Sequence, residues 1–275
     1  MAEHTINRRR DMNQINERIA EIVRRAGDII LSAHNVEDDG AVKEKHGDAA
    51  NMVTKYDVAV QEFLIGEITA ILPDASFIAE EKENDPEVLN RRHCFIIDPI
   101  DGTANFVHDY RHSCISLALI SHGAVEFAVV YDPYQSEMFT AERGGGAYLN
   151  GKRISVSSRE AAHSIVTFGT SPYYKTELGD KTFELCKKIF YITSDLRRSG
   201  SAALDLAYVA AGRIDMFFEL VLSPWDYAAG ILLVNEAGGK ISDMQGNAPS
   251  LCAPTPIIAA NAEVYETLLN ITKDA

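Results

Sequence analysis

The chain contains 275 residues, of which 46% are hydrophobic and 24% are charged, and this composition is typical of a globular protein rather than a disordered or fibrous one. Its length suits one large α/β domain or two closely packed subdomains. The formal net charge of −14 argues against a nucleic-acid-binding protein, which normally carries a basic patch, and we interpret the short run Arg8-Arg9-Arg10 as a solvated terminal segment.

The first third of the chain predicts two helices, a polar connection and a short strand. Apolar residues recur at intervals of three and four over residues 12–33 and again over 56–71, which is the spacing of an amphipathic helix. The segment between them, residues 35–51, is polar and contains glycines, so we expect an exposed loop or hairpin there. The run 76–79 predicts a strand that leads directly into the acidic pair Glu80-Glu81.

An apolar run at residues 94–97 predicts a buried strand. We expect Pro99 and the Gly102-Thr103 pair to end this strand in a tight, irregular turn. Asp98 and Asp101 would then lie together at a strand end, where carboxylate oxygens can converge on a hard cation such as Mg²⁺. An ordinary Asp-rich turn with a helix N-cap explains this segment equally well when it is considered alone.

The rest of the chain predicts alternating layers of strands and helices. Alternating apolar residues over 113–156 indicate an antiparallel meander, and Asn150-Gly151 is a strong signal for a two-residue hairpin turn. The elements expected after it are strands at 165–168, 216–219 and 257–260 and helices at 181–190, 202–211 and 227–237. We expect an α/β fold with α+β layers, divided near residue 150 into subdomains 1–150 and 151–275 that form one compact unit.

Acidic residues occur at the ends of three of these elements. They are Glu80-Glu81 after one strand, Asp98 and Asp101 after the next, and Asp226 just ahead of a helix. Considered alone, Glu80-Glu81 could be a solvated acidic pair, and Asp226 could be a helix N-cap. A two-metal site for phosphoryl transfer, however, needs several carboxylates, and strand ends and helix starts are where α/β proteins gather them.

Two segments of the chain resemble the signatures of the inositol monophosphatase family. The first runs from Asp98 through Phe106, and the second consists of Trp225-Asp226-Tyr227-Ala228-Ala229-Gly230 followed after six residues by Ala237-Gly238-Gly239. Their order and separation, with the acidic pair upstream, make the resemblance specific, and it extends over most of the chain. It implies an alternating α-β-α-β-α sandwich of the sugar phosphatase type.

The resemblance also implies a metal-dependent hydrolytic site. Two or three Mg²⁺ ions would be bound by Glu80, Asp98, the carbonyl of Ile100, Asp101 and Asp226, with Asp98 bridging. Thr103, oriented by Asp57 and close to Glu80, would help to position or deprotonate the attacking water. Most of the metal ligands would lie in the subdomain 1–150, whereas Asp226 and the specificity residues would lie in 151–275.

The substrate end of the site is implied by the same resemblance. The phosphate would lie against Gly102 and Thr103, where a helix-like segment begins. The polyol would face Gly200, Ser201 and Ala202 at the start of a helix, together with Asp226 and with Glu219 at a strand end. Glu219 could accept hydrogen bonds from ring hydroxyls, which would select substrates that carry them. Without the resemblance, we would interpret Glu219 as a surface acidic residue at the end of a strand.

The resemblance implies a lithium-sensitive, Mg²⁺-dependent phosphatase that converts myo-inositol monophosphate to inositol and phosphate. The alternatives are a fructose-1,6-bisphosphatase, a 3′-phosphoadenosine nucleotide phosphatase and, ranked below them, a non-catalytic regulatory homologue. The family implies a homodimer. We expect a cytoplasmic location with no membrane partner, because there is no signal-peptide pattern and no run of about 20 apolar residues, and because the four cysteines are widely spaced.

Overall fold

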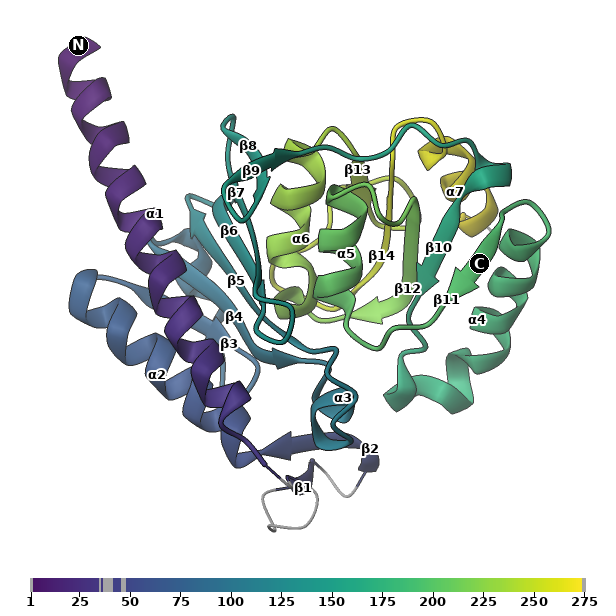
Figure 1. Ribbon diagram of the computed structural model, residues 1–275, viewed down its shortest axis with the longest axis horizontal. Helices are drawn as coiled ribbons and strands as arrows, with labels where there is room; N and C mark the ends of the chain where they lie inside the picture. The colour runs from purple at the N-terminus through teal and green to yellow at the C-terminus, as the bar shows by residue number, and fades with distance from the viewer. Residues whose placement is uncertain (1, 35, 37–41, 46–47, 274–275) are drawn as a thin grey trace.

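The computed structural model describes residues 2–34, 36, 42–45 and 48–273 (Figure 1). The helices are α1 (Ala2–Leu31), α2 (Lys55–Ile71), α3 (Thr103–Val107), α4 (Lys175–Phe190), α5 (Ala202–Ala210), α6 (Pro224–Glu236) and α7 (Tyr265–Thr272). The strands are β1 (Val42–Lys45), β2 (Asp48–Thr54), β3 (Ser76–Ala79), β4 (Cys94–Asp101), β5 (Cys114–Ser121), β6 (Ala124–Asp132), β7 (Glu137–Glu142), β8 (Gly146–Leu149), β9 (Lys152–Ile154), β10 (Ile165–Phe168), β11 (Asp195–Arg197), β12 (Met216–Leu222), β13 (Lys240–Ser242) and β14 (Thr255–Ala260).

Five layers succeed one another across the molecule (Figure 1). Helices α1 and α2 cover one face of a seven-stranded sheet of order β3-β4-β5-β6-β7-β8-β9, and α5 and α6 lie between that sheet and a five-stranded sheet of order β11-β10-β12-β14-β13. Helices α4 and α7 cover the outer face of the second sheet. This arrangement confirms the predicted α-β-α-β-α sandwich.

The two sheets differ in strand direction. In the seven-stranded sheet β3 and β4 are parallel and all the other neighbours are antiparallel, as the predicted meander requires. In the five-stranded sheet β10 is parallel to both β11 and β12, and β14 is antiparallel to both of its neighbours. The turn at Asn150-Gly151 is confirmed, since β8 pairs with β9 and the φ angles of the two residues are 49° and 74°.

Each layer boundary is filled by apolar side chains. One buried cluster lies between α1, α2 and the first sheet, a second surrounds α5 and α6, and a third lies under α4 and α7. The middle cluster draws its residues from both sheets, from Ile78 in β3 to Ala259 in β14. The division of the chain near residue 150 stays a prediction; the connection between the two sheets runs from Ile154 to Ile165.

The predicted start of the first helix is wrong, whereas the hairpin expected within residues 35–51 agrees with the structure. Helix α1 begins at Ala2, ten residues before the expected start, because its first turns extend beyond the sheet layers and therefore lack an apolar stripe (Figure 1). The side chains of Arg8-Arg9-Arg10 lie outside the described part of the chain. The segment 35–51 contains the antiparallel pair β1 and β2, although residues 35, 37–41 and 46–47 of that prediction are also outside the described residues.

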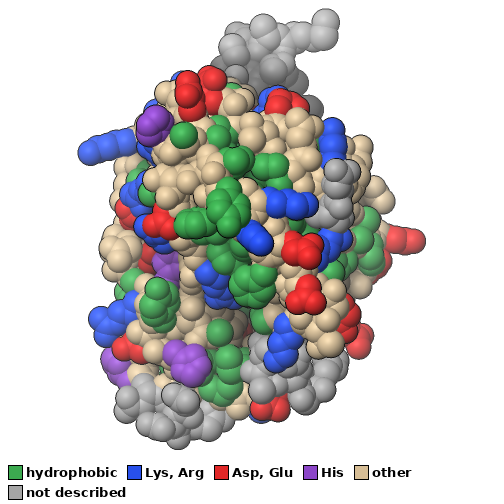
Figure 2. All heavy atoms as spheres, turned by 90° about the vertical axis from the view of Figure 1, so that its right-hand side faces the viewer, with side chains coloured by type: hydrophobic (Ala, Val, Ile, Leu, Met, Phe, Trp, Pro, Cys, Tyr) green, Lys and Arg blue, Asp and Glu red, His purple; other side chains and the backbone are tan. Residues whose placement is uncertain are grey.

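Helix α4 exposes large apolar side chains on its outer face and at its ends. Figure 2 shows this face, with hydrophobic side chains gathered near its middle and Lys and Arg among them. The exposed apolar residues are Tyr173 (50%), Tyr174 (43%), Phe183 (62%), Phe190 (52%), Tyr191 (76%) and Ile192 (38%). Among the described residues, no helix combines the length and the apolar character needed to cross a bilayer.

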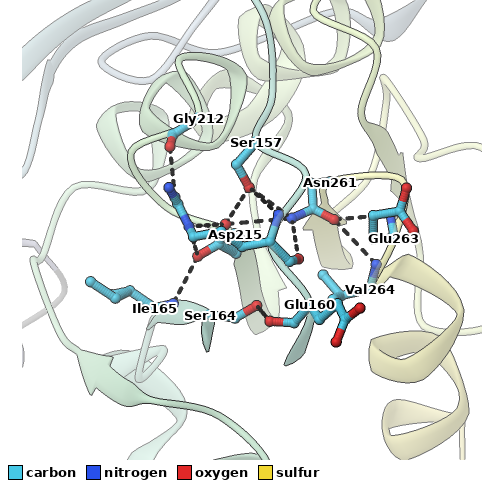
Figure 3. A network of polar contacts seen from close by, with 10 residues as sticks. Ser157, Glu160, Ser164, Ile165, Gly212, Asp215, Asn261, Glu263 and Val264 are labelled. Atoms are coloured by element: carbon cyan, nitrogen blue, oxygen red, sulfur yellow. Dashed lines mark hydrogen bonds and ion pairs between the residues drawn. The ribbon is translucent and has the colours of Figure 1, made fainter. Parts of the chain in front are cut away.

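A buried carboxylate fastens the connection between the two sheets (Figure 3). Asp215, which is fully buried before β12, accepts hydrogen bonds from the Ser157 hydroxyl, from Arg159 Nε at 2.9 Å and from the Ile165 amide at 2.8 Å. Asn261, after β14, donates to Ser157 Oγ at 2.9 Å and to the Arg159 carbonyl at 3.1 Å. The network therefore holds the connection between the sheets against the start of β12 and the end of β14.

We predict that Asp215→Ala lowers the free energy of unfolding by about 3 kcal/mol or more, because it leaves several buried donors without an acceptor. Urea denaturation measures the change. Glu266→Ala is the control, since its ion pair with Lys240 at 3.1 Å is more than half exposed on both sides and should contribute less than about 1 kcal/mol. Equal effects of the two substitutions would contradict this prediction.

Candidate active site

A cavity of about 410 Å³ opens where the end of β4 meets α3, β12 and the starts of α5 and α6. Every residue that the sequence implicated in metal or substrate binding lines it, and Asp57 lies beneath Thr103. The lining residues that were predicted are Glu80, Asp98, Ile100, Asp101, Gly102, Thr103, Gly200, Ser201, Ala202, Glu219 and Asp226. The fold therefore brings together segments that are more than 140 positions apart in the sequence.

The two aspartates of the first motif lie on an irregular part of β4. The predicted strand end at residue 97 is wrong, because Asp98 still pairs with Ser116 and Asp101 pairs with Cys114, with a shift of register between the two aspartates. The bulge accommodates Pro99, which has no amide hydrogen for a regular ladder, and it directs both carboxylates into the cavity. Asp98 is 2% exposed and Asp101 is 8% exposed.

Asp101 is held by the start of α5. Its Oδ2 accepts hydrogen bonds from Ser201 Oγ at 2.5 Å and from the Ala203 amide at 2.8 Å, and Cys114 Sγ lies 3.8 Å away. Ser201 is 1% exposed. Its hydroxyl therefore donates to the Asp101 carboxylate, and the assignment of this residue to the polyol stays a prediction.

Asp226 comes from the first turn of α6. It is the third helical residue rather than the N-cap, and its Oδ2 accepts the Ser223 amide at 2.7 Å in a capping box. One carboxylate oxygen from each of Asp98, Asp101 and Asp226 lies within 4.8 Å of the other two. Three acids from β4 and α6 thus converge on one point.

Asp57 and Thr103 form a second polar group at the edge of the cavity. Asp57 closes a capping box at the start of α2, in which its Oδ2 accepts the Thr54 hydroxyl at 2.5 Å and the Thr54 amide at 2.8 Å. Its Oδ1 lies 3.3 Å from Thr103 Oγ1, which also lies 3.1 Å from the carbonyl of Ile100. Thr103 therefore connects α2 to the bulge of β4.

The turn after β3 carries Glu80 to the cavity, and a glutamine of α2 holds this turn. The Glu80 amide donates to the Ile97 carbonyl at 3.2 Å, which continues the pairing of β3 with β4. Gln61 exchanges two hydrogen bonds with the backbone of Glu81, at 2.9 and 3.1 Å. The sequence analysis missed Gln61, although its position four residues after Asp57 puts two polar side chains on one buried helix face.

Burial and mutual repulsion raise the pKa values of the buried acids in and beside the cavity. Burial raises the pKa of Asp57 to about 7 and the pKa of Asp101 to about 6, and repulsion from Glu80 adds to both increases. The pKa values of Asp98 and Asp226 are raised well above the ordinary range, first by burial and then by repulsion from neighbouring acids. An all-carboxylate donor set that is costly to ionise without a counter-charge fits a hard divalent cation such as Mg²⁺.

Glu219 forms the opposite wall of the cavity. The prediction that it ends a strand is wrong, because β12 continues to Leu222 after a shift of register, and Glu219 is only 7% exposed. Its Oε1 accepts the Ser171 amide at 2.8 Å and the Ser171 hydroxyl at 3.2 Å, and burial raises its pKa to about 7. A Cβ at Gly169 would lie 1.8 Å from Glu219 Oε2, so only glycine fits there.

We predict that the protein in EDTA loses stability as the pH rises from about 4 to about 7. Asp57 and Asp101 have folded-state pKa values above the ordinary 3.8, so the folded chain binds more protons than the unfolded chain in this range. Their contribution is full below pH 3.8 and is lost as the pH passes the folded-state values. Urea midpoints at about pH 5 and about pH 8 measure the slope, which Mg²⁺ should reduce. A midpoint in EDTA that rises between these pH values would contradict the prediction.

Comparison with known proteins identifies the family. Residues 11–275 match the model of the inositol monophosphatase family. The Nus factor SuhB of Escherichia coli strain K12 is 39% identical over 251 residues, which cover 91% of this chain and 92% of the relative. The solved structure of an IMPase from Thermotoga maritima is 32% identical, with a TM-score of 0.82 and coverage of 93% and 95%. A structure described as an IMPase/NADP phosphatase complexed with Mg²⁺ and phosphate is 26% identical, with a TM-score of 0.83 and coverage of 95% of both chains. The chain belongs to the inositol monophosphatase family.

Proposed function

We propose that the protein is a Mg²⁺-dependent phosphatase that hydrolyses a small phosphorylated polyol, with myo-inositol monophosphate as its preferred substrate. The observation that carries this proposal is the convergence of Asp98, Asp101 and Asp226 within 4.8 Å in the cavity. Family membership supports the reaction class. The related IMPase/NADP phosphatase, whose structure contains Mg²⁺ and phosphate, supports the metal and the product.

The metal ligands in this proposal are the carboxylates of Glu80, Asp98, Asp101 and Asp226 and the carbonyl of Ile100. This set would hold two or three ions. When bound, Mg²⁺ would lower the pKa of a water molecule and would neutralise charge on the leaving oxygen. The protein contributes a rigid donor set, because each of Asp98, Asp101 and Asp226 accepts a backbone amide.

Thr103 and Asp57 orient the attacking water. The Thr103 hydroxyl is directed by Asp57 Oδ1 and by the Ile100 carbonyl, which leaves its oxygen lone pairs to accept a hydrogen bond from water. The pKa of Asp57, raised to about 7 by burial, suits a group that takes up a proton near neutral pH. Glu80, on the adjacent turn, completes this end of the site.

The two ends of the substrate contact different elements. The phosphate lies against Gly102 and Thr103 at the first turn of α3, where amides have no intrahelical acceptor. Gly102 has a φ of 90°, and a Cβ there would approach the carbonyls of His112 and Gly200 to 3.0 and 3.1 Å. The polyol lies against Gly200, Ser201 and Ala202 and hydrogen-bonds to Glu219 and to Asp226.

A substrate with a second phosphate is the alternative. Arg198 is the one cationic side chain among the described residues that line the cavity, and its Nη2 lies 3.3 Å from Thr170 Oγ1 near the rim. Such a group could bind the second phosphate of fructose 1,6-bisphosphate or of a 3′-phosphoadenosine nucleotide. The buried acceptor Glu219 favours the polyol, because a hydroxyl-rich ring satisfies it whereas a phosphate repels it.

We predict Mg²⁺-dependent release of phosphate from inositol 1-phosphate, with kcat/KM at least about tenfold above that for fructose 1,6-bisphosphate and 3′-phosphoadenosine 5′-phosphate. Lithium should inhibit it. Asp98→Asn should lower kcat by a factor of about 10³ or more while the chain stays folded. Phosphate release and circular dichroism measure the two effects. Glu126→Gln, a substitution of an exposed acid in β6, is the matched control and should leave turnover unchanged.

If Mg²⁺ supports no turnover of any of these esters, the proposed reaction is wrong. If Asp98→Asn keeps full turnover, the proposed metal ligands are wrong. If the enzyme prefers fructose 1,6-bisphosphate or 3′-phosphoadenosine 5′-phosphate, inositol monophosphate is not its main substrate. Arg198 would then be the residue expected to bind the second phosphate.

We further propose that the protein is a cytoplasmic homodimer with a second, protein-binding role. The name Nus factor given to the Escherichia coli relative supports such a role alongside an intact site. The apolar surface at α4 supports self-association, because monomers seldom leave large aromatic residues exposed in one group. The free thiols of Cys94, Cys114 and Cys186, all buried, suit a reducing compartment.

We predict that the double substitution Phe183→Ser and Tyr191→Ser converts the dimer into a monomer, because both side chains are more than 60% exposed on the free chain. Light scattering coupled to size-exclusion chromatography measures the mass. Val58→Ser, at an exposed apolar position of α2 on the opposite side of the molecule, is the control and should leave the mass unchanged. A wild-type chain that elutes as a monomer would contradict the prediction.

A further inference from the structure

The turn Ser199-Gly200-Ser201, between β11 and α5, joins the two ends of the cavity. The Ser199 carbonyl accepts a hydrogen bond from Asn105 Nδ2 of α3 at 3.0 Å. Two residues later, the Ser201 hydroxyl donates to Asp101. Gly200 has a φ of 93°, and a Cβ at this position would lie 2.4 Å from Arg198 Nη1. The path of this turn therefore fixes the contact that α5 makes with Asp101.

A buried aspartate of α5 holds the turn from behind. Ser199 Oγ donates to Asp205 Oδ2 at 2.7 Å and accepts the Ser201 amide at 3.3 Å. The Asp205 amide in turn donates to the Ser201 carbonyl at 3.1 Å. Asp205 is 2% exposed, so its carboxyl group is part of the protein interior. A chain of hydrogen bonds thus runs from Asp205 through Ser199 and Ser201 to Asp101.

The second oxygen of Asp205 lacks a conventional partner. Among the described residues, Asp205 Oδ1 and Thr167 Oγ1 are both buried without a hydrogen bond of normal geometry, although the Thr167 hydroxyl is close enough to lower the pKa of Asp205. Burial raises the pKa of Asp205 well above the ordinary value, and repulsion from Asp101 and Glu219 acts in the same direction.

We propose that Asp205 is a positioning residue that acts through Ser199 to hold Ser201 against Asp101. This inference rests on the proposed function, in which Asp101 is a metal ligand. Asp205 is among the residues that line the cavity, but its Oδ1 is buried and its Oδ2 accepts the Ser199 hydroxyl, so it acts through Ser199. Loss of its side chain should therefore weaken metal binding by loosening a ligand rather than by removing one.

Calorimetric titration of the whole chain with Mg²⁺ tests the inference without requiring turnover. Asp205→Ala and Ser199→Ala should each raise the Mg²⁺ Kd about tenfold, which is the effect of losing one buried hydrogen bond to a carboxyl group. The double variant should be no weaker than either single variant, because both remove the same connection. Asp205→Asn should stay within about twofold of the wild type, since asparagine keeps an oxygen acceptor for Ser199 and has the shape of the neutral acid.

Asp215→Ala is the matched control, because it removes another fully buried aspartate of the same half of the chain from a network away from the cavity (Figure 3). It should lower stability and leave the Mg²⁺ Kd unchanged. An unchanged Mg²⁺ Kd in Asp205→Ala and Ser199→Ala would overturn the inference. So would a double variant whose increase in Kd is the product of the two single increases, or an Asp205→Asn variant whose Kd is raised as much as that of Asp205→Ala. If the wild-type chain binds no Mg²⁺, both the proposed function and this role of Asp205 are wrong. If the wild-type chain binds Mg²⁺ but any of the contradicting variant results is observed, only the role of Asp205 is wrong.

Discussion

The repulsion between buried carboxylates is the constraint on which the site depends. Asp98, Asp101 and Asp226 are directed at one point from β4 and α6, with Glu80 and Asp57 at the edge. A protein interior does not accommodate several unpaired negative charges, so the acids either take up protons or share cations. The same arrangement that opposes ionisation in the metal-free chain suits the cavity to a divalent cation. In a protein with a net charge of −14, bound cations would also offset the repulsion of an anionic phosphate ester.

Two helix starts supply acids that have both a structural and a chemical role. Asp57 and Asp226 are each the third residue of a helix, and each closes a capping box with the hydroxyl residue three positions earlier, Thr54 or Ser223. One oxygen of the carboxylate satisfies the end of its own helix. In Asp57 the other oxygen interacts with Thr103. The helix cap fixes the side-chain rotamer, so the orientation of the functional group is set by local folding and does not depend on the ligand.

The sequence predicted most of what local pattern can determine. Apolar periodicity located α2, α4, α5 and α6, and the two motifs located the acids of the cavity. It did not predict that β4 continues through Asp98 and Asp101, because Pro99 and Gly102 are turn residues and only pairing with β5 maintains the strand. It also missed the contacts of Gln61 and Asp205, since those depend on which segments the fold brings together. Local sequence patterns identify the acidic residues of the cavity, whereas tertiary contacts determine how rigidly their side chains are held.

The cavity lies between two irregular strands, one from each sheet. The register of β4 shifts between Asp98 and Asp101, and the register of β12 shifts between Glu219 and Leu222. A bulge redirects side chains, so each sheet presents acids to the space between them. The first sheet carries Asp98 and Asp101, which are proposed for the reaction, and the second carries Glu219, which is proposed for substrate choice. Because the start of α5 bonds to Asp101 and also lines the part of the cavity proposed for the polyol, it connects the two groups of residues. A change of substrate preference is therefore tolerated on β12 more readily than at the start of α5, where it would also disturb Asp101.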